Sequence, residues 1–94
     1  MALARVVSFD GVSSARMAEL QSRVQESGRP EDVPASELML LHNPESETAL
    51  AIIFFDNEED YRRGDAALGA MPTDETPGQR SSVTRYEVTV RMTA

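Results

Sequence analysis

The chain has 94 residues, 40% of them hydrophobic, which predicts one small folded domain over residues 1–94 rather than a disordered segment. Its net charge of −7 disfavours nucleic acid as a partner, because phosphate backbones require a basic patch and the nine basic residues here are dispersed among acids. The absence of cysteine excludes disulfides and thiolate sites, and no apolar run approaches the roughly 18 residues of a membrane span, so we expect a soluble, cytoplasmic protein without a membrane partner.

The first half of the chain predicts a strand followed by a helix. Residues 2–9 are rich in β-branched and aromatic side chains and predict the strand. Ser13 is a good N-cap for a helix that continues to about Ser27. Gly28 and Pro30 then end it, since glycine accepts a left-handed conformation and proline cannot continue the hydrogen-bond ladder. The apolar face of this helix consists of Met17, Leu20 and Val24.

The second half predicts a hairpin, a helix and a last strand. Two apolar runs joined by a short polar connection are typical of a β-hairpin. The resulting order is β-α-β-β-α-β, which predicts a ferredoxin-like α+β fold: an antiparallel four-stranded sheet with two helices on one face. The expected elements are strands at 37–42 and 48–55, a helix from Asp56 to about Met71, a loop at 72–81 with a type II turn at Pro77-Gly78, and a strand at 82–92.

Both hairpin strands are apolar at odd and even positions. Residues 38–41 and 49–55 show this pattern, which is typical of strands buried on both faces. Because two helices can cover one side of such a sheet, something else must cover the other side. We expect a second copy of the chain, packed sheet to sheet with two-fold symmetry. An exposed apolar patch that binds a different partner is the alternative.

The segment 56–65 concentrates acids and arginines at the start of the second helix. Asp56 and Glu59 have the D-x-x-E spacing of a capping box, and acids in the first turn suit the helix dipole. Glu58 and Glu59 each precede an arginine by four residues, a spacing that favours ion pairs. We therefore expect a solvated helix face with its acids in water rather than a metal or acid–base site. The residues expected to rest on the sheet are Tyr61, Gly64, Leu68 and Met71.

A few polar side chains are candidate functional residues. His42 is the single histidine, so it can act as a general base or simply bond to nearby backbone, but one chain cannot form a two-histidine metal site. Tyr61 and Tyr86 can both point between helices and sheet, where they would orient a ligand or serve as core residues with a wet tip. Arg85 and Arg91, on the polar side of the last strand, can bind an anion or pair with nearby acids.

The element order, the doubly apolar hairpin and the segment 82–88, SVTRYEV, resemble the dimeric α+β barrel superfamily. The segment 56–65, DNEEDYRRGD, together with Met71-Pro72 and Thr76-Pro77-Gly78, is similar to small bacterial, actinobacterial, antibiotic-biosynthesis-monooxygenase-like (ABM-like) proteins. The likeness covers essentially the whole chain. It implies a homodimer with a pocket between helices and sheet in each subunit.

The resemblance leaves two functions open. One is a cofactor-independent monooxygenase, or an isomerase, that acts on a small apolar or aromatic metabolite. The other is a non-catalytic ligand-binding or accessory module with the same pocket. Haem degradation is disfavoured, because the chain has no tryptophan and its histidine lies on a strand end, and we expect no cofactor and no metal. We assign catalysis to His42 and Tyr86, and substrate binding to Tyr61, Leu68, Phe54 and Arg85.

Overall fold

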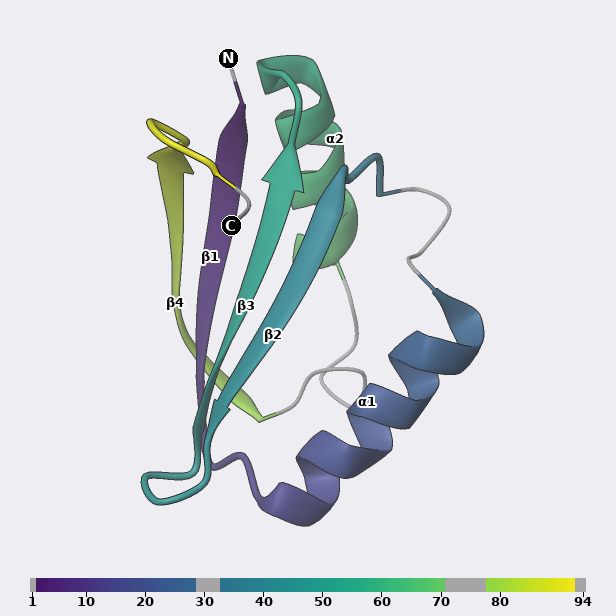
Figure 1. Cartoon of the computed structure of the whole chain (residues 1–94), viewed down its shortest axis with the longest axis vertical. Helices are drawn as coiled ribbons and strands as arrows, with labels where there is room; N and C mark the ends of the chain where they lie inside the picture. The colour runs from purple at the N-terminus through teal and green to yellow at the C-terminus, as the bar shows by residue number, and fades with distance from the viewer. Residues whose placement is uncertain (1, 29–32, 71–77, 93–94) are drawn as a thin grey trace.

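The computed structural model describes residues 2–28, 33–70 and 78–92, which form one sheet and two helices (Figure 1). The elements are β1 (Leu3–Asp10), α1 (Ser14–Ser27), β2 (Glu37–Asn43), β3 (Thr48–Phe55), α2 (Glu58–Gly69) and β4 (Gln79–Glu87). The strands pair antiparallel in the order β2-β3-β1-β4. This is the predicted ferredoxin-like α+β fold. No helix among the described residues is long and apolar enough to cross a membrane.

One face of the sheet, which we call the helix face, contacts both helices. It carries the odd-numbered positions of β1 and β3 and the even-numbered positions of β2. Figure 1 shows α2 behind the sheet and α1 lower, toward the β2 side. The core is divided between them into two apolar clusters. The α2 cluster contains Leu3, Val33, Ala35, Ile53, Phe55 and Tyr61, with Ala67 and Leu68; the α1 cluster contains Val7, Phe9, Val12, Ala49 and Ala51, with Met17 and Leu40.

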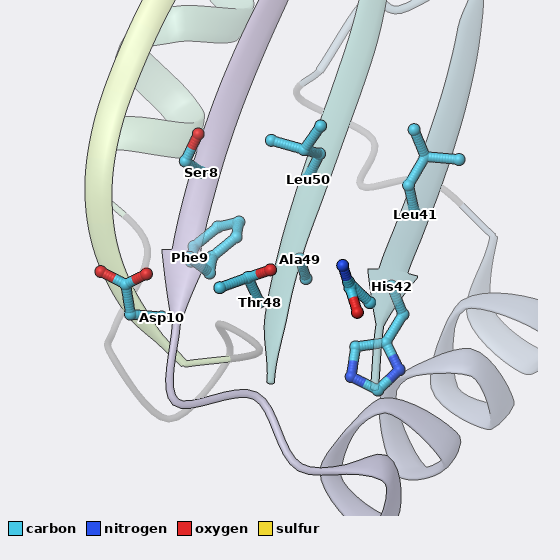
Figure 2. Close-up of a pocket in the computed structure, with 9 residues that line it drawn as sticks. Ser8, Phe9, Asp10, Leu41, His42, Thr48, Ala49 and Leu50 are labelled. Atoms are coloured by element: carbon cyan, nitrogen blue, oxygen red, sulfur yellow. The ribbon is translucent and has the colours of Figure 1, made fainter. Parts of the chain in front are cut away.

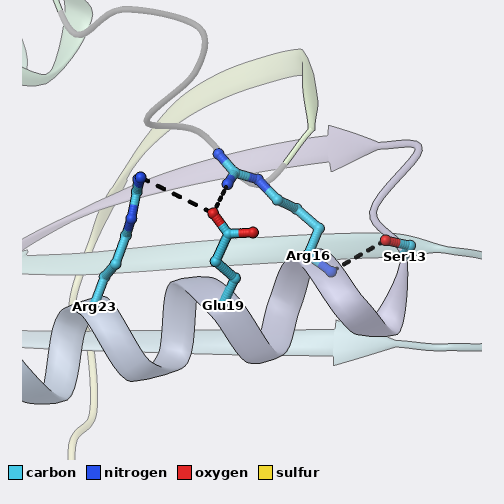
Figure 3. A network of polar contacts seen from close by, with 4 residues as sticks. All are labelled: Ser13, Arg16, Glu19 and Arg23. Carbon is cyan, nitrogen blue, oxygen red and sulfur yellow. Dashed lines mark hydrogen bonds and ion pairs between the residues drawn. The ribbon is translucent and has the colours of Figure 1, made fainter.

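The boundaries of α1 confirm the predicted cap at Ser13 and end at Gly28, while Pro30 lies outside the described residues. Ser13 is the N-cap, and its Oγ accepts a hydrogen bond of 3.1 Å from the Arg16 N–H. Gly28 ends the helix at a φ of 69°, in the left-handed region that favours glycine. On the solvent side, Glu19 Oε1 lies 2.9 Å from Arg16 and 4.0 Å from Arg23 (Figure 3). Such pairs are individually weak, so the apolar face of α1 provides most of its attachment.

The cap of α2 lies one residue later than predicted. Asn57 is the N-cap, and its Oδ1 accepts a hydrogen bond of 2.8 Å from the Asp60 N–H. The predicted Asp56–Glu59 capping box is therefore wrong, because the Asn57 side chain is the one that reaches the third helical N–H. The expected helix end at Met71 lies outside the described residues, as does Pro77 of the expected turn.

The acids of α2 pair with the sheet rather than within the helix. The predicted i,i+4 pairs of Glu58 and Glu59 are absent from the described part of the chain. Instead Glu58 Oε1 lies 3.5 Å from Nη1 of Arg85 on β4, and Asp65 pairs with Arg5 on β1. Glu58 and Asp65 keep contact with water, at 64% and 49% exposed, as predicted, but their pairing with strand arginines is not part of that prediction. These two lie at the edges of α2, where the packing of the helix brings strand arginines within reach.

The last strand starts and ends earlier than predicted, at 79–87 instead of 82–92. Its partner β1 begins at Leu3, which lies opposite Glu87, so the sheet offers little pairing beyond that point. One further backbone hydrogen bond of 3.0 Å joins the Val88 N–H to the carbonyl of residue 2. The alternation of the sequence continues past 87, but a strand needs a neighbour to pair with.

Residues 88–92, the C-terminal segment, pass across the face of the sheet opposite the helices (Figure 1). The Arg91 guanidinium lies over the ring of Phe54, with its Cζ 4.4 Å from the ring centroid. Arg91 also forms an ion pair with Glu37 of β2. The segment is thereby fixed at one end of this side, while its own Val90 and Met92 remain exposed.

The side of the sheet that no described helix covers is the open face. Leu41 is 44% exposed there and Leu50 is 36% exposed, values far above those of the core. The expected uncovered apolar surface is therefore confirmed for the single chain. Its larger side chains are Val6, Met39, Leu41, Leu50, Ile52, Phe54 and Tyr86.

Gly64→Ala should lower the free energy of unfolding by about 1–3 kcal/mol, because an added Cβ would overlap Cε1 and Cζ of the fully buried Phe55 ring. This clash outweighs the roughly 1 kcal/mol that alanine gains over glycine inside a helix. Gly69→Ala in the same helix is the matched control, since its Cβ would meet nothing within 4 Å. Urea unfolding followed by circular dichroism compares them, and equal stabilities would contradict the close approach of α2 to β3.

Candidate functional site

A buried arginine lies in the middle of the helix face. Arg5 stands on β1 between Leu3 of the α2 cluster and Val7 of the α1 cluster, and its side chain is 3% exposed. A guanidinium group does not lose its proton in proteins, so its charge has to be accommodated inside the core. Burying a charge is costly unless it is paired and hydrogen-bonded. The stability of this part of the core therefore depends on the side chains that contact Arg5.

Asp65 of α2 is the direct partner of Arg5. Its Oδ1 accepts a hydrogen bond of 2.8 Å from Arg5 Nε, and its side chain is 49% exposed. The helix can reach this position because Gly64, the preceding residue, has no Cβ to collide with Phe55. The ion pair therefore extends from the centre of the sheet to a solvent-accessible edge of α2.

A second arginine lies beside the first. Arg85 of β4 is the register partner of Arg5, so both side chains leave the sheet on the helix face. The Arg85 Cζ lies 5.1 Å from the ring centroid of Tyr61, within the range of a cation–π interaction, and Nη1 is 3.5 Å from Glu58 Oε1. Three elements thus contribute to one group, the polar cluster of Arg5, Glu58, Tyr61, Asp65 and Arg85.

Tyr61 keeps its proton inside the polar cluster. Burial and the Asp65 carboxylate raise the pKa of its hydroxyl, and the guanidinium groups of Arg5 and Arg85 offset this only in part. At neutral pH the hydroxyl is therefore an uncharged group that can donate a hydrogen bond. Leu68 packs against the same apolar cluster as Tyr61, which gives the site an apolar wall beside its polar groups.

His42 lies elsewhere, at the end of β2. Its Nε2 is 3.0 Å from the carbonyl oxygen of Val12, which can only accept, so this contact places the proton on Nε2 and leaves Nδ1 as an acceptor. The geometry matches the alternative in which this histidine bonds to backbone. An open depression of about 430 Å³ adjoins it (Figure 2). The lining residues are Ser8, Phe9, Asp10, Leu41, His42, Asn43, Thr48, Ala49 and Leu50.

Tyr86 lies on the open face, which corrects the expectation that it points between helices and sheet. Its register partner is Ala4, and its side chain is 54% exposed. Successive side chains of a strand point to opposite faces of the sheet. Arg85, which we expected on the polar side of the strand, lies on the helix face, so Tyr86 lies on the other. Phe54 also belongs to the open face, where Arg91 stacks on it.

The structure brings together three of the six predicted site residues, Tyr61, Leu68 and Arg85. His42, Tyr86 and Phe54 lie away from these three residues, and the roles assigned to all six stay predictions. Arg5 and Asp65 were missed. A signal for Arg5 existed, because a lone arginine in the middle of an apolar strand requires an anionic partner, but the sequence does not indicate which acid supplies it.

Neither models of known protein families nor curated proteins show a match to this chain. Within the described residues, no group of three or more histidine or acidic side chains is placed to hold a metal ion. The polar cluster can supply hydrogen-bond donors from Arg5, Arg85 and Tyr61, and a carboxylate from Asp65. Such a set is suited to binding and orienting a small polar group next to an apolar surface.

Asp65→Asn should lower the free energy of unfolding by about 1–3 kcal/mol, because it leaves the buried Arg5 guanidinium without its anionic partner. The half-exposed position of Asp65 keeps the effect below that of a fully buried pair. Glu19→Gln, which breaks the exposed pairs of Figure 3, is the control and should cost less than about 0.5 kcal/mol. Thermal and urea unfolding measure both; equally small losses would show that Arg5 does not depend on Asp65.

Proposed function

We propose that the protein is an ABM-like homodimer that binds a small apolar or aromatic metabolite beneath α2. The observation that carries this proposal is the division of the sheet into two faces with different chemistry. The open face is apolar and no described helix covers it, whereas the helix face holds the polar cluster beside an apolar wall. A cytoplasmic location, expected from the sequence, stays a prediction.

The open face suits a second copy of the same chain. Charged side chains occur only at its ends among the described residues, with Asp10 at one end and the Glu37–Arg91 pair at the other. Two chains that each carry a net charge of −7 repel through most of their surfaces, so an uncharged apolar face is the favourable place to meet. A two-fold homodimer, in which the same surface of each chain is buried, is the commonest form of self-association.

For the activity, the resemblance to ABM-like proteins supports a cofactor-independent monooxygenase. In such a reaction the substrate itself supplies the electrons to O₂. One oxygen atom enters the product as a carbonyl, and the other leaves as water with two hydrogens from the substrate. Arg85, Tyr61 and Leu68 would orient the ring, and the apolar neighbours would limit access of water.

A non-catalytic binding or accessory module is the second candidate. It is favoured by the position of His42, whose Nε2 is engaged by Val12 and which is not part of the polar cluster. Among the described residues, Asp65 is the one carboxylate in direct contact with Arg5, and it is committed to an ion pair rather than poised as a general base.

Leu41→Glu should convert the dimer to a monomer, because it places a charge among the exposed apolar side chains of the proposed interface. Leu38→Glu is the matched control: it lies on the same strand at similar exposure, 37% against 44%, but on the helix face. Sedimentation velocity at micromolar concentration measures the oligomeric state, with circular dichroism to check folding. A monomeric wild type, or dissociation by Leu38→Glu alone, would contradict the proposed interface.

Oxygen uptake with polyphenolic compounds tests the catalytic candidate. We expect turnover that falls at least tenfold in Arg85→Met and in Tyr61→Phe, since both remove contacts beneath α2. Tyr86→Phe and His42→Ala test other positions for the active site, on the open face and at the end of β2. If these two variants abolish turnover while Arg85→Met leaves it intact, the active site does not lie beneath α2. Binding of the same compounds without oxygen uptake would favour the accessory module.

A further inference from the structure

We infer that the second copy of the chain packs on the open face in one particular orientation, in which the C-terminal segment of each chain fills the depression beside β1 and β3 of the other. In this opposed orientation, β1 of one chain runs opposite to β1 of the other. The inference rests on the proposed dimer and deepens it, because it specifies how the two chains lie and which residues meet. It is drawn from the relief and the charge of the open face.

The C-terminal segment forms a ridge at one end of the open face. It crosses the sheet where β1 begins and β3 ends (Figure 1), and Arg91 holds it there through the ring of Phe54 and the ion pair with Glu37. Val90 is 73% exposed and Met92 is 87% exposed, the highest values of any large apolar side chain in the described part of the chain. Two such side chains, held side by side on a fixed segment, favour contact with a further apolar surface.

The opposite end of the open face is hollowed. The depression of about 430 Å³ lies where β1 ends and β3 begins, and most of its lining residues belong to the open face by strand parity (Figure 2). Leu41 and Leu50 contribute exposed apolar side chains to it. Apolar side chains that enter this depression remove both apolar surfaces from water, which is favourable.

The ridge and the depression fit each other in one of the two face-to-face arrangements that a two-fold axis allows. Packed sheets lie about 10 Å apart, so a segment that lies on one sheet fills most of the gap between them. With the axis along the strands, ridge meets ridge and the two depressions face each other across a void. With the axis across the strands, each ridge meets the depression of the other chain, and the symmetry forms both contacts at once.

The charges at the ends of the open face favour the same orientation. Asp10 lines the depression and forms no ion pair with the described residues. If both β1 strands ran in the same direction, the two uncompensated Asp10 carboxylates would approach each other, which is unfavourable. In the opposed orientation, Asp10 instead approaches the pair of Glu37 and Arg91, which is neutral as a whole. The Arg91 guanidinium has five N–H donors and is 41% exposed, so it can serve a second carboxylate as well.

Cysteine cross-linking tests the orientation, because the chain has no cysteine of its own. Ser8→Cys places a thiol in the depression and Met92→Cys places one on the ridge. The two single variants are mixed, allowed to exchange subunits, and oxidised at micromolar concentration; mass spectrometry then counts the links. The opposed orientation predicts about tenfold more links between positions 8 and 92 than 8–8 or 92–92 links, since a disulfide requires Cα atoms within about 7 Å. Each single variant, oxidised alone, is the control and should remain largely unlinked.

A second measurement removes the apolar side chains of the ridge. Val90→Ser/Met92→Ser should raise the dissociation constant of the dimer about tenfold or more, because two apolar side chains lose their burial. Val83→Ser is the matched control, since Val83 is 41% exposed but lies on the helix face opposite Val7. Sedimentation velocity across a concentration series gives the dissociation constants, and circular dichroism checks that both variants fold.

Three outcomes would overturn the inference while leaving the dimer in place: self-links in the single variants, a dimer in which positions 8 and 92 do not link, or a dissociation constant that Val90→Ser/Met92→Ser leaves unchanged. Failure of the proposed dimer gives a different result. A wild-type chain that stays monomeric at micromolar concentration would defeat the interface itself, and the inferred orientation with it.

Discussion

The ion pair between Arg5 and Asp65 connects the central strand β1 to α2, and the arrangement of the helix face depends on it. A charged side chain at this position interrupts what would otherwise be a continuous apolar row from Leu3 to Phe9. The core is consequently divided into an α2 cluster and an α1 cluster, with Arg5 between them. The charge also explains why α2 approaches the sheet so closely at Gly64, since Asp65 follows it directly.

The same constraint separates two kinds of surface. On the helix face, the buried side chains of Arg5 and Tyr61 meet the more exposed Asp65, Arg85 and Glu58, so the polar cluster extends from the core to solvent. On the open face, charge is confined to the ends, and the apolar side chains remain exposed in a single chain. The proposed self-association and the proposed ligand binding would therefore use different residues.

The fold followed from the sequence because its signals were local. The cap at Ser13 and the end at Gly28 depend on neighbours in the chain, and the structure bears them out. The site depended on contacts between distant residues. Strand register decides that Arg85 faces α2 while Tyr86 does not, and the pairing of Arg5 with Asp65 joins positions 60 residues apart. Glu58 and Asp65 pair with arginines of the strands while staying partly in water, and the local charge pattern of their segment does not indicate these pairs.

The most direct measurement of this arrangement is the hydrogen-exchange rate of the Arg5 Nε–Hε group, followed by ¹⁵N NMR. If Nε donates to Asp65 beneath α2, its signal should be resolved, exchange far more slowly than that of the exposed Arg62, and lose protection in Asp65→Asn. Exchange of Arg5 as fast as that of Arg62 would contradict a buried ion pair, and with it the organisation of the helix face described above.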